Sequence, residues 1–583
     1  MVILRTQSDF GHAPPPQTPY SIVTNLPGWD LLKSIRQGDT SPLARVVHIY
    51  PRLSPTQFVR TLSAEIAKKV GLEEKACMMY LDPVMWRYTK SHVAHELRRE
   101  HAISPDRLTL KVVDVAGHRL YCVLYDPQHS RALMLSWGTP GLGLSIRQAE
   151  YLLDRVDTMV EVSFDDENAP PRPTWAPEGP DHEPLRQRIN DLVHHGAIDP
   201  EKVKSQSKDV FLYPSGMAAV FTAKIILQDY RPNRTNVELG MVFHNTHELL
   251  REESPGGWKH FGSVDSEGLE MLETWLEKEE AEGRGATFVI VEFPSNPTLE
   301  SPDLPRLKRM VSDGGRHVVP FQGKVGRTNS KLGCLNSQSE RFNFVLIVDD
   351  TIGAFSNVDV LAQSDMLLTS LTKSFNGRSD ALGGSIVLNP LSPHYQELQK
   401  RFAEGHHNQL SAADAKVLLS NSRDFFDRAA RLNANAQAMA ELLHRNMTEQ
   451  PGSPIVGVQY PSLLPSKANY DAFMRRRTPE LPHPGYGCLL TVNLAGVEAA
   501  RAFYDRCGFY PSPHIGGHVT IMFAYNMFMF GKDPQEAEAL RAYGIFEDSV
   551  RISAGLERVE DLLDTLQDAL DAAAKVGRGG KEG

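Results

Sequence analysis

Two hydroxyl side chains lie next to a lysine in the segment LLTSLTKSFNGRSDALGGSIVL, residues 367–388. Ser370 and Thr372 are two positions apart, so they face the same side of an extended segment, while Lys373 faces the other side. An Asn-Gly turn and a pair of glycines follow. This clustering favours a phosphate-binding cup beside a reactive amine, and a solvated surface lysine is the alternative.

A glycine-containing turn at the start of a helix is a second feature suited to a phosphate. In FLYPSGMAAVFTAKIIL, residues 211–227, a short strand reaches Ser215, Gly216 and Met217, where an alanine-rich helix begins. Glycine permits a tight turn, and the free N–H groups of a helix N-terminus suit an anion. Many turns of this kind bind nothing, so the segment indicates a site only together with its neighbours.

Charged side chains stand at two further places where buried strands are predicted. The apolar run VLIVDD, residues 345–350, ends in Asp349 and Asp350, and α/β sheets bind their ligands at this end of a parallel strand. Arg551 stands between two apolar residues just before the last helix, where a planar guanidinium usually meets a carboxylate. The alternatives are a helix cap for either aspartate and an internal ion pair for the arginine.

These segments lie in a pattern of helices and strands that begins near residue 185. Near-continuous apolar runs at 286–293 and 344–350 are typical of buried parallel strands, and the pattern predicts an α/β fold with an open, mostly parallel sheet. The polar, glycine-rich stretch 312–343 is predicted to be an inserted surface loop. A long helical stretch near 391–450 leads to a smaller C-terminal α/β unit.

The length of 583 residues is too great for one hydrophobic core, and composition divides the chain further. Residues 1–20 are predicted to be disordered, because they contain three consecutive prolines and no hydrophobic period. An accessory α/β domain is expected at 21–165, with strand-like runs RVVHIY, LTLKVVDV and RLYCVLY and the amphipathic helix TQFVRTLSAEIAKK. A proline- and acid-rich linker at 166–184 precedes the large domain, 185–390, and the small C-terminal domain, 391–583.

Charge, hydropathy and cysteine usage exclude several classes of protein. The net charge of −10, from 62 basic and 72 acidic residues, disfavours a nucleic acid or an anionic membrane as partner. No apolar run is long enough to span a membrane, and the N-terminus does not resemble a secretory signal. The five scattered cysteines favour a reducing, cytoplasmic location. The 21 histidines are too dispersed to predict a metal site.

Together these segments resemble the pyridoxal-phosphate (PLP) enzymes of Cys/Met metabolism, the transsulfuration family. The resemblance rests on SxTK at 370–373, an Asp-x-Thr at the preceding strand end, and PSNP at 294–297. Five further segments narrow it to fungal cystathionine γ-synthases: 18–39, 48–55, 137–150, 485–494 and 504–521. The resemblance implies an aspartate-aminotransferase-like fold (fold type I) with an extra N-terminal domain, and a homodimer or homotetramer with shared active sites.

The resemblance also implies a role for each candidate residue. Lys373 would bind PLP covalently and then shuttle protons, and Asp349 would pair with the pyridine nitrogen of the cofactor. Asn296 would hydrogen-bond the ring hydroxyl, and Arg551 would bind the substrate α-carboxylate. The phosphate would be held by Gly216, Met217, Ser370 and Thr372.

The chain departs from the family pattern on the substrate side. His244, in VFHNTHE, stands where the family stacks a tyrosine over the cofactor, and it is predicted to be catalytic. His514 replaces the serine of a Ser-Leu-Gly motif and is predicted to bind substrate. The family motif WQHxGxGIS is changed after its tryptophan, and the Tyr/Arg motif that reaches the partner's phosphate is not recognisable in 170–200.

An intact cofactor set with an altered substrate side predicts γ-replacement on an O-acyl-L-homoserine, acetyl or succinyl. The nucleophile would be cysteine, giving cystathionine, or a different thiol, amine or carbon nucleophile of specialised metabolism. One alternative is a lyase that eliminates from a sulfur amino acid with the same PLP groups. The other is a non-catalytic scaffold with the PLP fold, against which the retained lysine, acid, hydroxyls and arginine argue.

Overall fold

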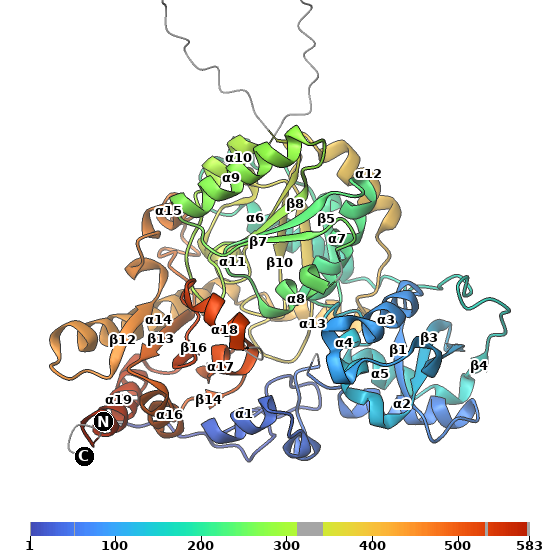
Figure 1. Cartoon of the computed structure of the whole chain (residues 1–583), viewed down its shortest axis with the longest axis horizontal. Helices are drawn as coiled ribbons and strands as arrows, with labels where there is room; N and C mark the ends of the chain where they lie inside the picture. Colours follow the sequence, from blue (N-terminus) through green and yellow to red (C-terminus); the bar gives the residue numbers. More distant parts are fainter. Residues whose placement is uncertain (1, 52, 253, 312–341, 531–533, 580–583) are drawn as a thin grey trace, which may run out of the picture.

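The computed structural model describes the chain except for residues 1, 52, 253, 312–341, 531–533 and 580–583. Figure 1 shows a central large domain, a C-terminal domain and an N-terminal accessory domain. The surface loop predicted at 312–343 lies almost entirely outside the described residues. Within the described part of the chain, no helix is long and apolar enough to cross a bilayer.

A seven-stranded sheet in the order β5-β11-β10-β9-β8-β6-β7 forms the centre of the large domain. β11 runs antiparallel to both of its neighbours, and the other neighbouring pairs are parallel, which confirms the predicted mostly parallel sheet. Every residue of β8 is buried, as expected of a strand covered on both faces. The strands are Val210–Tyr213 (β5), Thr235–Leu239 (β6), Trp258–Phe261 (β7), Ala286–Glu292 (β8), Val345–Asp349 (β9), Met366–Thr369 (β10) and Gly384–Leu388 (β11).

Helices cover both faces of this sheet. The helices that pack on one face are α6 (His182–His194), α9 (Ser266–Ala281), α10 (Leu304–Met310), α11 (Ala354–Asn357) and α13 (Ala412–Asn421). The other face meets α7 (Gly216–Tyr230), α8 (His244–Glu252) and α12 (Tyr395–Gly405), and the apolar core on this side continues into the accessory domain.

The C-terminal domain follows the long helix α14 (Phe425–Glu449), visible in orange in Figure 1. Its five-stranded sheet has the order β12-β13-β16-β15-β14. The strands are Ile455–Gln459 (β12), Leu489–Leu494 (β13), Tyr510–Pro511 (β14), Ile521–Phe523 (β15) and Ser549–Ser553 (β16). The remaining helices are α15 (Lys467–Asp471), α16 (Val497–Arg506), α17 (Tyr525–Met529), α18 (Pro534–Arg541) and α19 (Val559–Gly579).

The accessory domain contains an antiparallel sheet in the order β1-β3-β2-β4. Its strands are Ala76–Tyr80 (β1), Thr109–Val115 (β2), His118–Tyr125 (β3) and Val160–Glu161 (β4). Helices α2 (Gln57–Lys69) and α5 (Ile146–Leu153) pack on one face, and α3 (Val84–Ala94) and α4 (Ser130–Gly138) pack on the side of the large domain. The predicted strands LTLKVVDV and RLYCVLY and the first helix form as expected, whereas RVVHIY forms no strand.

Residues 2–50 form an N-terminal arm that packs on the C-terminal domain rather than a disordered start followed by a separate domain. The backbone N–H groups of Val2 and Leu4 donate to side chains of α19, and that of Leu26 donates to the carbonyl oxygen of Pro511 at 2.9 Å. Trp29, at the start of α1 (Trp29–Arg36), is buried in the C-terminal core. The scattered apolar residues of the arm fill positions in the core of another domain, so they show no period of their own.

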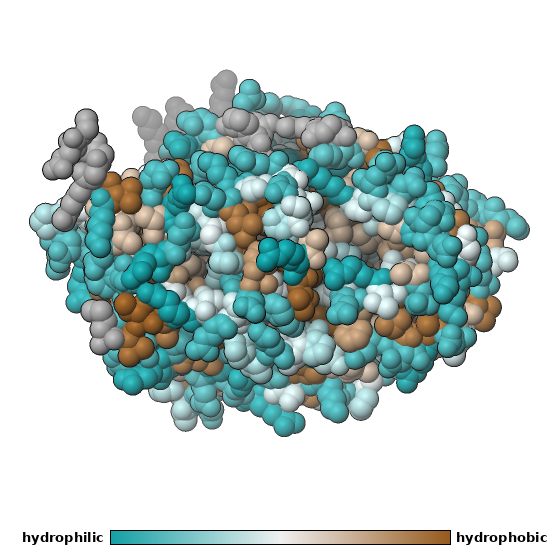
Figure 2. All heavy atoms as spheres, turned by 90° about the horizontal axis from the view of Figure 1, so that it is seen from below, coloured by the Kyte–Doolittle hydropathy of each residue, from teal (hydrophilic) through white to brown (hydrophobic). Residues whose placement is uncertain are grey.

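Hydrophilic residues cover most of the face shown in Figure 2, and apolar residues appear there in small separate groups. A surface of this kind is ordinary for a folded chain, since apolar atoms always make up part of the accessible surface. The candidate site lies instead in the interior, where the units of the chain meet.

Candidate active site

A cavity lies at the carboxyl ends of β8 and β9, between the large domain, the C-terminal domain and the arm. This is the edge at which α/β sheets bind ligands. The structure brings together at this cavity most of the residues predicted from the sequence: Gly216, Met217, Asn296, Asp349, Ser370, Lys373 and Arg551. Thr372, His514 and His244 do not line it.

The start of α7 forms one end of the cavity. Ser215 is the helix cap, and its hydroxyl accepts from the N–H of Ala218 at 3.1 Å. Gly216 and Met217 follow in the first turn, where backbone N–H groups have no partner within the helix. A Cβ at Gly216 would stand 2.7 Å from the Cβ of Ser370, so only glycine allows this close approach. The donors and the hydroxyl of Ser370 suit an anionic group such as a phosphate.

Thr372 takes a different direction from Ser370. β10 ends at Thr369, and the residues that follow form a turn rather than the extended segment assumed in the prediction. The hydroxyl of Thr372 donates to the carbonyl oxygen of Gly383 at 3.2 Å and accepts from its N–H at 3.1 Å. Thr372 therefore holds the turn that carries Lys373.

Asp349 places a half-buried carboxyl group in the cavity. Burial raises its pKa to about 6, although the N–H of Thr351 donates to Oδ1 at 2.9 Å. Glu292 pairs with it across β8 and β9, and burial raises the pKa of Glu292 well above its ordinary value, with the Asp349 charge as a further cause. Asp350 turns away to the hydroxyl of Thr369. Since the charged carboxylate is costly here, a cationic partner at Asp349 is strongly favoured.

Lys373 meets a tyrosine from the N-terminal arm. Its Nζ donates to the hydroxyl of Tyr50 at 3.3 Å and lies 4.9 Å from the centre of the Tyr50 ring. The neighbouring Ile49 is buried in the C-terminal core, which fixes this part of the arm. Sequence reasoning missed Tyr50 because it treated RVVHIY as a strand of a separate domain.

Arg551, on β16, reaches the cavity from the C-terminal domain and is only 4% exposed. Its guanidinium donates to Oδ1 of Asn296 at 3.0 Å and to the carbonyl oxygen of Pro513 at 3.2 Å, and it lies 3.8 Å from the centre of the Tyr525 ring. These partners are uncharged, so the positive charge of Arg551 is available to a ligand carboxylate.

His514 lies behind the cavity wall formed by its neighbours Pro513 and Ile515. It is 2% exposed, and its ring lies 6.0 Å from that of Tyr50. Burial, and then the charges of Lys373 and Arg551, hold its pKa well below the ordinary value, so the imidazole is neutral. Within the described part of the chain, neither ring nitrogen has a hydrogen-bond partner.

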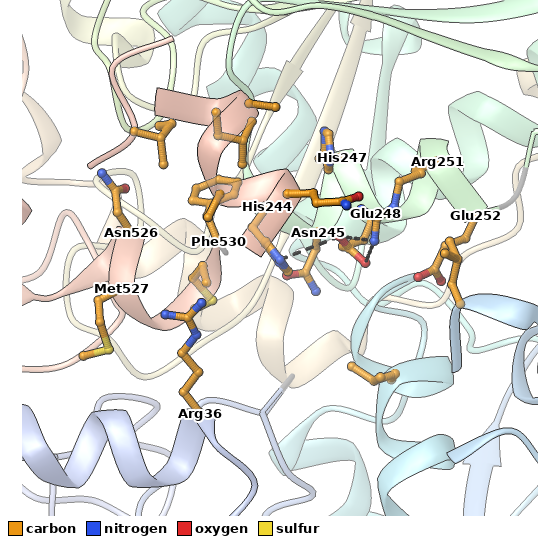
Figure 3. A pocket seen from close by; sticks show the side chains of 18 of the residues that line it. Arg36, His244, Asn245, His247, Glu248, Arg251, Glu252, Asn526, Met527 and Phe530 are labelled. Atoms are coloured by element: carbon orange, nitrogen blue, oxygen red, sulfur yellow. Dashed lines mark hydrogen bonds and ion pairs between the residues drawn. The ribbon is translucent and has the colours of Figure 1, made fainter. Parts of the chain in front are cut away.

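His244 lies in a separate, larger cleft, shown in Figure 3, of about 1330 Å³. Its Nε2 is 3.8 Å from Oε1 of Glu248, and its ring is 5.4 Å from that of Phe530. Phe243 and Thr246, on either side of it along the chain, line the cavity instead. The predicted place of His244 over the cofactor does not agree with this geometry, because the turn into α8 directs Phe243 inward.

Comparisons with known proteins agree with this arrangement. Residues 335–571 match the model of the Cys/Met metabolism PLP-dependent enzymes. The cystathionine gamma-synthase-like enzyme iboG2 of Amanita muscaria is 27% identical, over 98% of this chain and 97% of that protein. Alanine racemase ungC of Aspergillus violaceofuscus is also 27% identical, over 97% of this chain and 96% of that protein.

The fold is likewise that of a solved structure, yeast cystathionine gamma-lyase. The two chains are 23% identical with a TM-score of 0.51, over 70% of this chain and 91% of the yeast enzyme. The helix start, the half-buried carboxyl group and the lysine in one cavity fit a phosphate, a protonated ring nitrogen and an aldehyde. The chain is thus similar to the PLP-dependent enzymes of Cys/Met metabolism, by the family model over residues 335–571 and by its relatives over nearly its whole length, and its cofactor is PLP.

Proposed function

We propose that this protein catalyses γ-replacement on an O-acyl-L-homoserine, acetyl or succinyl, by adding a nucleophile at Cγ. The observation that carries the proposal is the meeting of Lys373, Asp349 and Arg551 in one cavity. An amine, a half-buried carboxyl group and an available guanidinium are the groups that an amino-acid substrate and PLP require. Cysteine, or a diverged thiol, amine or carbon nucleophile, would be the second substrate.

PLP, when bound, supplies an electron sink for negative charge that develops on the substrate. Lys373 would hold the cofactor, and its amine would then move protons at Cα and Cβ of the substrate. Asp349 would keep the pyridine nitrogen protonated, which also relieves the cost of burying its own charge. Asn296 would hydrogen-bond the ring hydroxyl. The phosphate would be bound by Gly216, Met217 and Ser370. Thr372 would contribute only if its hydroxyl gave up its hydrogen bonds with Gly383.

Arg551 would bind and orient the α-carboxylate of the substrate. Its fork is already held by Asn296 and Pro513, so little conformational freedom is lost when a carboxylate arrives. His514 would act on the nucleophile through its bulk, because it supports the cavity wall formed by Pro513 and Ile515 and its lowered pKa makes it a weak base. A homodimer or homotetramer with shared active sites is part of the same proposal.

Related PLP enzymes act on small amino acids, but by different reactions, as the names of the two relatives indicate. Elimination from a sulfur amino acid would use the same lysine, acid and arginine and differs in the access of a nucleophile. Racemisation would need only proton transfer at Cα. The proposal is therefore tested against both.

The decisive measurement feeds O-acetyl- and O-succinyl-L-homoserine with cysteine and with other thiols, amines and carbon acids, and identifies products by mass spectrometry. We expect release of the acyl acid and a product with the nucleophile attached at Cγ. Lys373→Ala should lose both the product and the visible absorption band of bound PLP. Formation of 2-oxobutyrate and ammonia without incorporation would establish a lyase, and D-alanine from L-alanine alone would establish a racemase.

Arg551→Lys is expected to raise the Michaelis constant for the acylhomoserine roughly tenfold to hundredfold, the effect of weakening a hydrogen-bonded charge pair. Lysine keeps the charge but loses the two-pronged geometry. The visible spectrum of the cofactor should not change, because Arg551 faces the substrate. A variant whose spectrum collapsed would instead assign Arg551 to the structure of the site.

Asp349→Asn is expected to stabilise the cofactor-free protein at pH 7 by up to about 3 kcal/mol, because its raised pKa of about 6 makes the ionised carboxylate costly. The cost is present above pH 6 and disappears as pH falls below the ordinary pKa of 3.8, so no gain is expected at pH 3.5. Urea unfolding at both pH values measures the difference.

Asp571→Asn serves as the control for Asp349→Asn, because the side chain of Asp571 is exposed on α19. In the presence of PLP the order of stability should reverse, so that wild type is more stable than Asp349→Asn, because the variant binds the cofactor more weakly. Equal stability of wild type and Asp349→Asn at pH 7 without cofactor would contradict the predicted cost of the buried charge.

His514→Ser is expected to increase the rate with cysteine relative to the other nucleophiles, because it removes bulk behind the wall formed by Pro513 and Ile515. His244→Tyr is the matched control: it alters the separate cleft and should leave nucleophile preference unchanged. Efficient cystathionine formation by the wild type, unaltered in His514→Ser, would show that the protein is an ordinary cystathionine γ-synthase.

A further inference from the structure

A loop of the accessory domain, residues 138–145, lies directly against the start of α7. The carbonyl oxygen of Gly141 accepts a hydrogen bond from the hydroxyl of Ser215 at 2.8 Å. Trp137, just before the loop, and Leu142, within it, share an apolar cluster with Met217 and Ala218 of α7. The accessory domain therefore contacts the helix end that forms one wall of the cavity.

Gly141 stands where no side chain fits. Its φ is +68°, in the left-handed region that favours glycine. A Cβ at this position would stand 2.3 Å from Oγ of Ser215 and 3.0 Å from Cβ of Met217. Both the backbone conformation and the space thus require glycine, and both bring the carbonyl group to Ser215.

The hydroxyl of Ser215 is fixed from two sides. It donates to the carbonyl oxygen of Gly141 and accepts from the N–H of Ala218 at 3.1 Å. Because a hydroxyl rotates freely, the bond to Gly141 holds its lone pair on Ala218, the third residue of the helix. The capped N–H of Ala218 leaves those of Gly216 and Met217 as the first-turn donors at the cavity.

The loop is anchored to the large domain at two further helix starts. The side chain of Asn245 in the first turn of α8 donates to the carbonyl oxygen of Gly138 at 3.4 Å. Arg147 donates to Oδ1 of Asp414 in α13 at 3.1 Å, and Ser145 also donates to Asp414. Three separate anchors hold the loop rigidly enough to fix the position of one carbonyl group.

We propose that the accessory domain positions the phosphate-binding end of the cofactor site, with Gly141 acting through Ser215 as the positioning residue. This inference rests on the proposed binding of the PLP phosphate by Gly216 and Met217. It gives the accessory domain a role in cofactor affinity and predicts that the role concerns the phosphate alone. The ring would instead be held by Asp349 and Lys373, which belong to β9 and to the turn after β10 rather than to the helix start that the loop supports.

The test compares PLP with pyridoxal, which lacks the phosphate, by titrating the full-length chain after cofactor removal. Gly141→Ala should weaken PLP binding about tenfold or more, the effect of losing a charge-assisted hydrogen bond, while the affinity for pyridoxal changes little. Ser215→Ala should change the PLP-to-pyridoxal ratio in the same direction without introducing a clash. It therefore answers the question even if Gly141→Ala fails to fold.

Gly117→Ala is the matched control, because Gly117 lies in the same domain at φ +81° with open space around its Cβ position. It carries a similar backbone strain and should keep the wild-type ratio. Equal weakening of both ligands in Gly141→Ala and Ser215→Ala, or no weakening of either, would overturn the inference. Borohydride labelling of the wild type separates the two proposals: a label on a lysine other than Lys373 would refute the proposed site itself.

Discussion

The carboxyl group of Asp349 at the end of β9 is the constraint on which the site depends. It is half-buried beside the buried carboxyl group of Glu292, and desolvation raises the pKa of both groups. An isolated pair of buried acids lowers stability whenever either ionises. Such a pair is tolerated where a bound cation offsets this loss of stability, and the protonated ring nitrogen of PLP is a cation of that kind. If PLP binds as proposed, cofactor binding and the stability of the sheet are linked through this one group.

All units of the chain contribute residues around that carboxyl group. β9 supplies the acid, the turn after β10 supplies Lys373, and β16 supplies Arg551 from the C-terminal domain. The arm adds Tyr50, and the accessory loop supports the start of α7. The large domain thus supplies both the acid and the lysine, and the C-terminal domain adds the guanidinium, so the complete set of charges exists only in the assembled chain.

Sequence patterns sufficed for the central sheet and for the charged groups at its edge. Apolar runs of strand length identify β8 and β9, and charged side chains at their ends stand out against that background. The inward direction of Phe243 rather than His244 could not be predicted, because one residue of helix rotates a side chain by about 100° and the start of α8 was uncertain. Tyr50 and Gly141 could not be identified from the sequence, because each contacts a residue far away along the chain and the contact depends on the path of the backbone.

The same distinction explains how relatives of one fold acquire different reactions. The groups that bind PLP must satisfy a fixed phosphate, ring and lysine, so few replacements are tolerated among them. Phe243 and His514 face no such fixed partner. Phe243 brings to the cavity a ring that exchanges no proton, and His514 lies behind the wall with a lowered pKa that makes it a weak base. Proton transfer on the substrate side must therefore come from Lys373 and its neighbours. The choice of nucleophile is then governed by the wall that His514 supports.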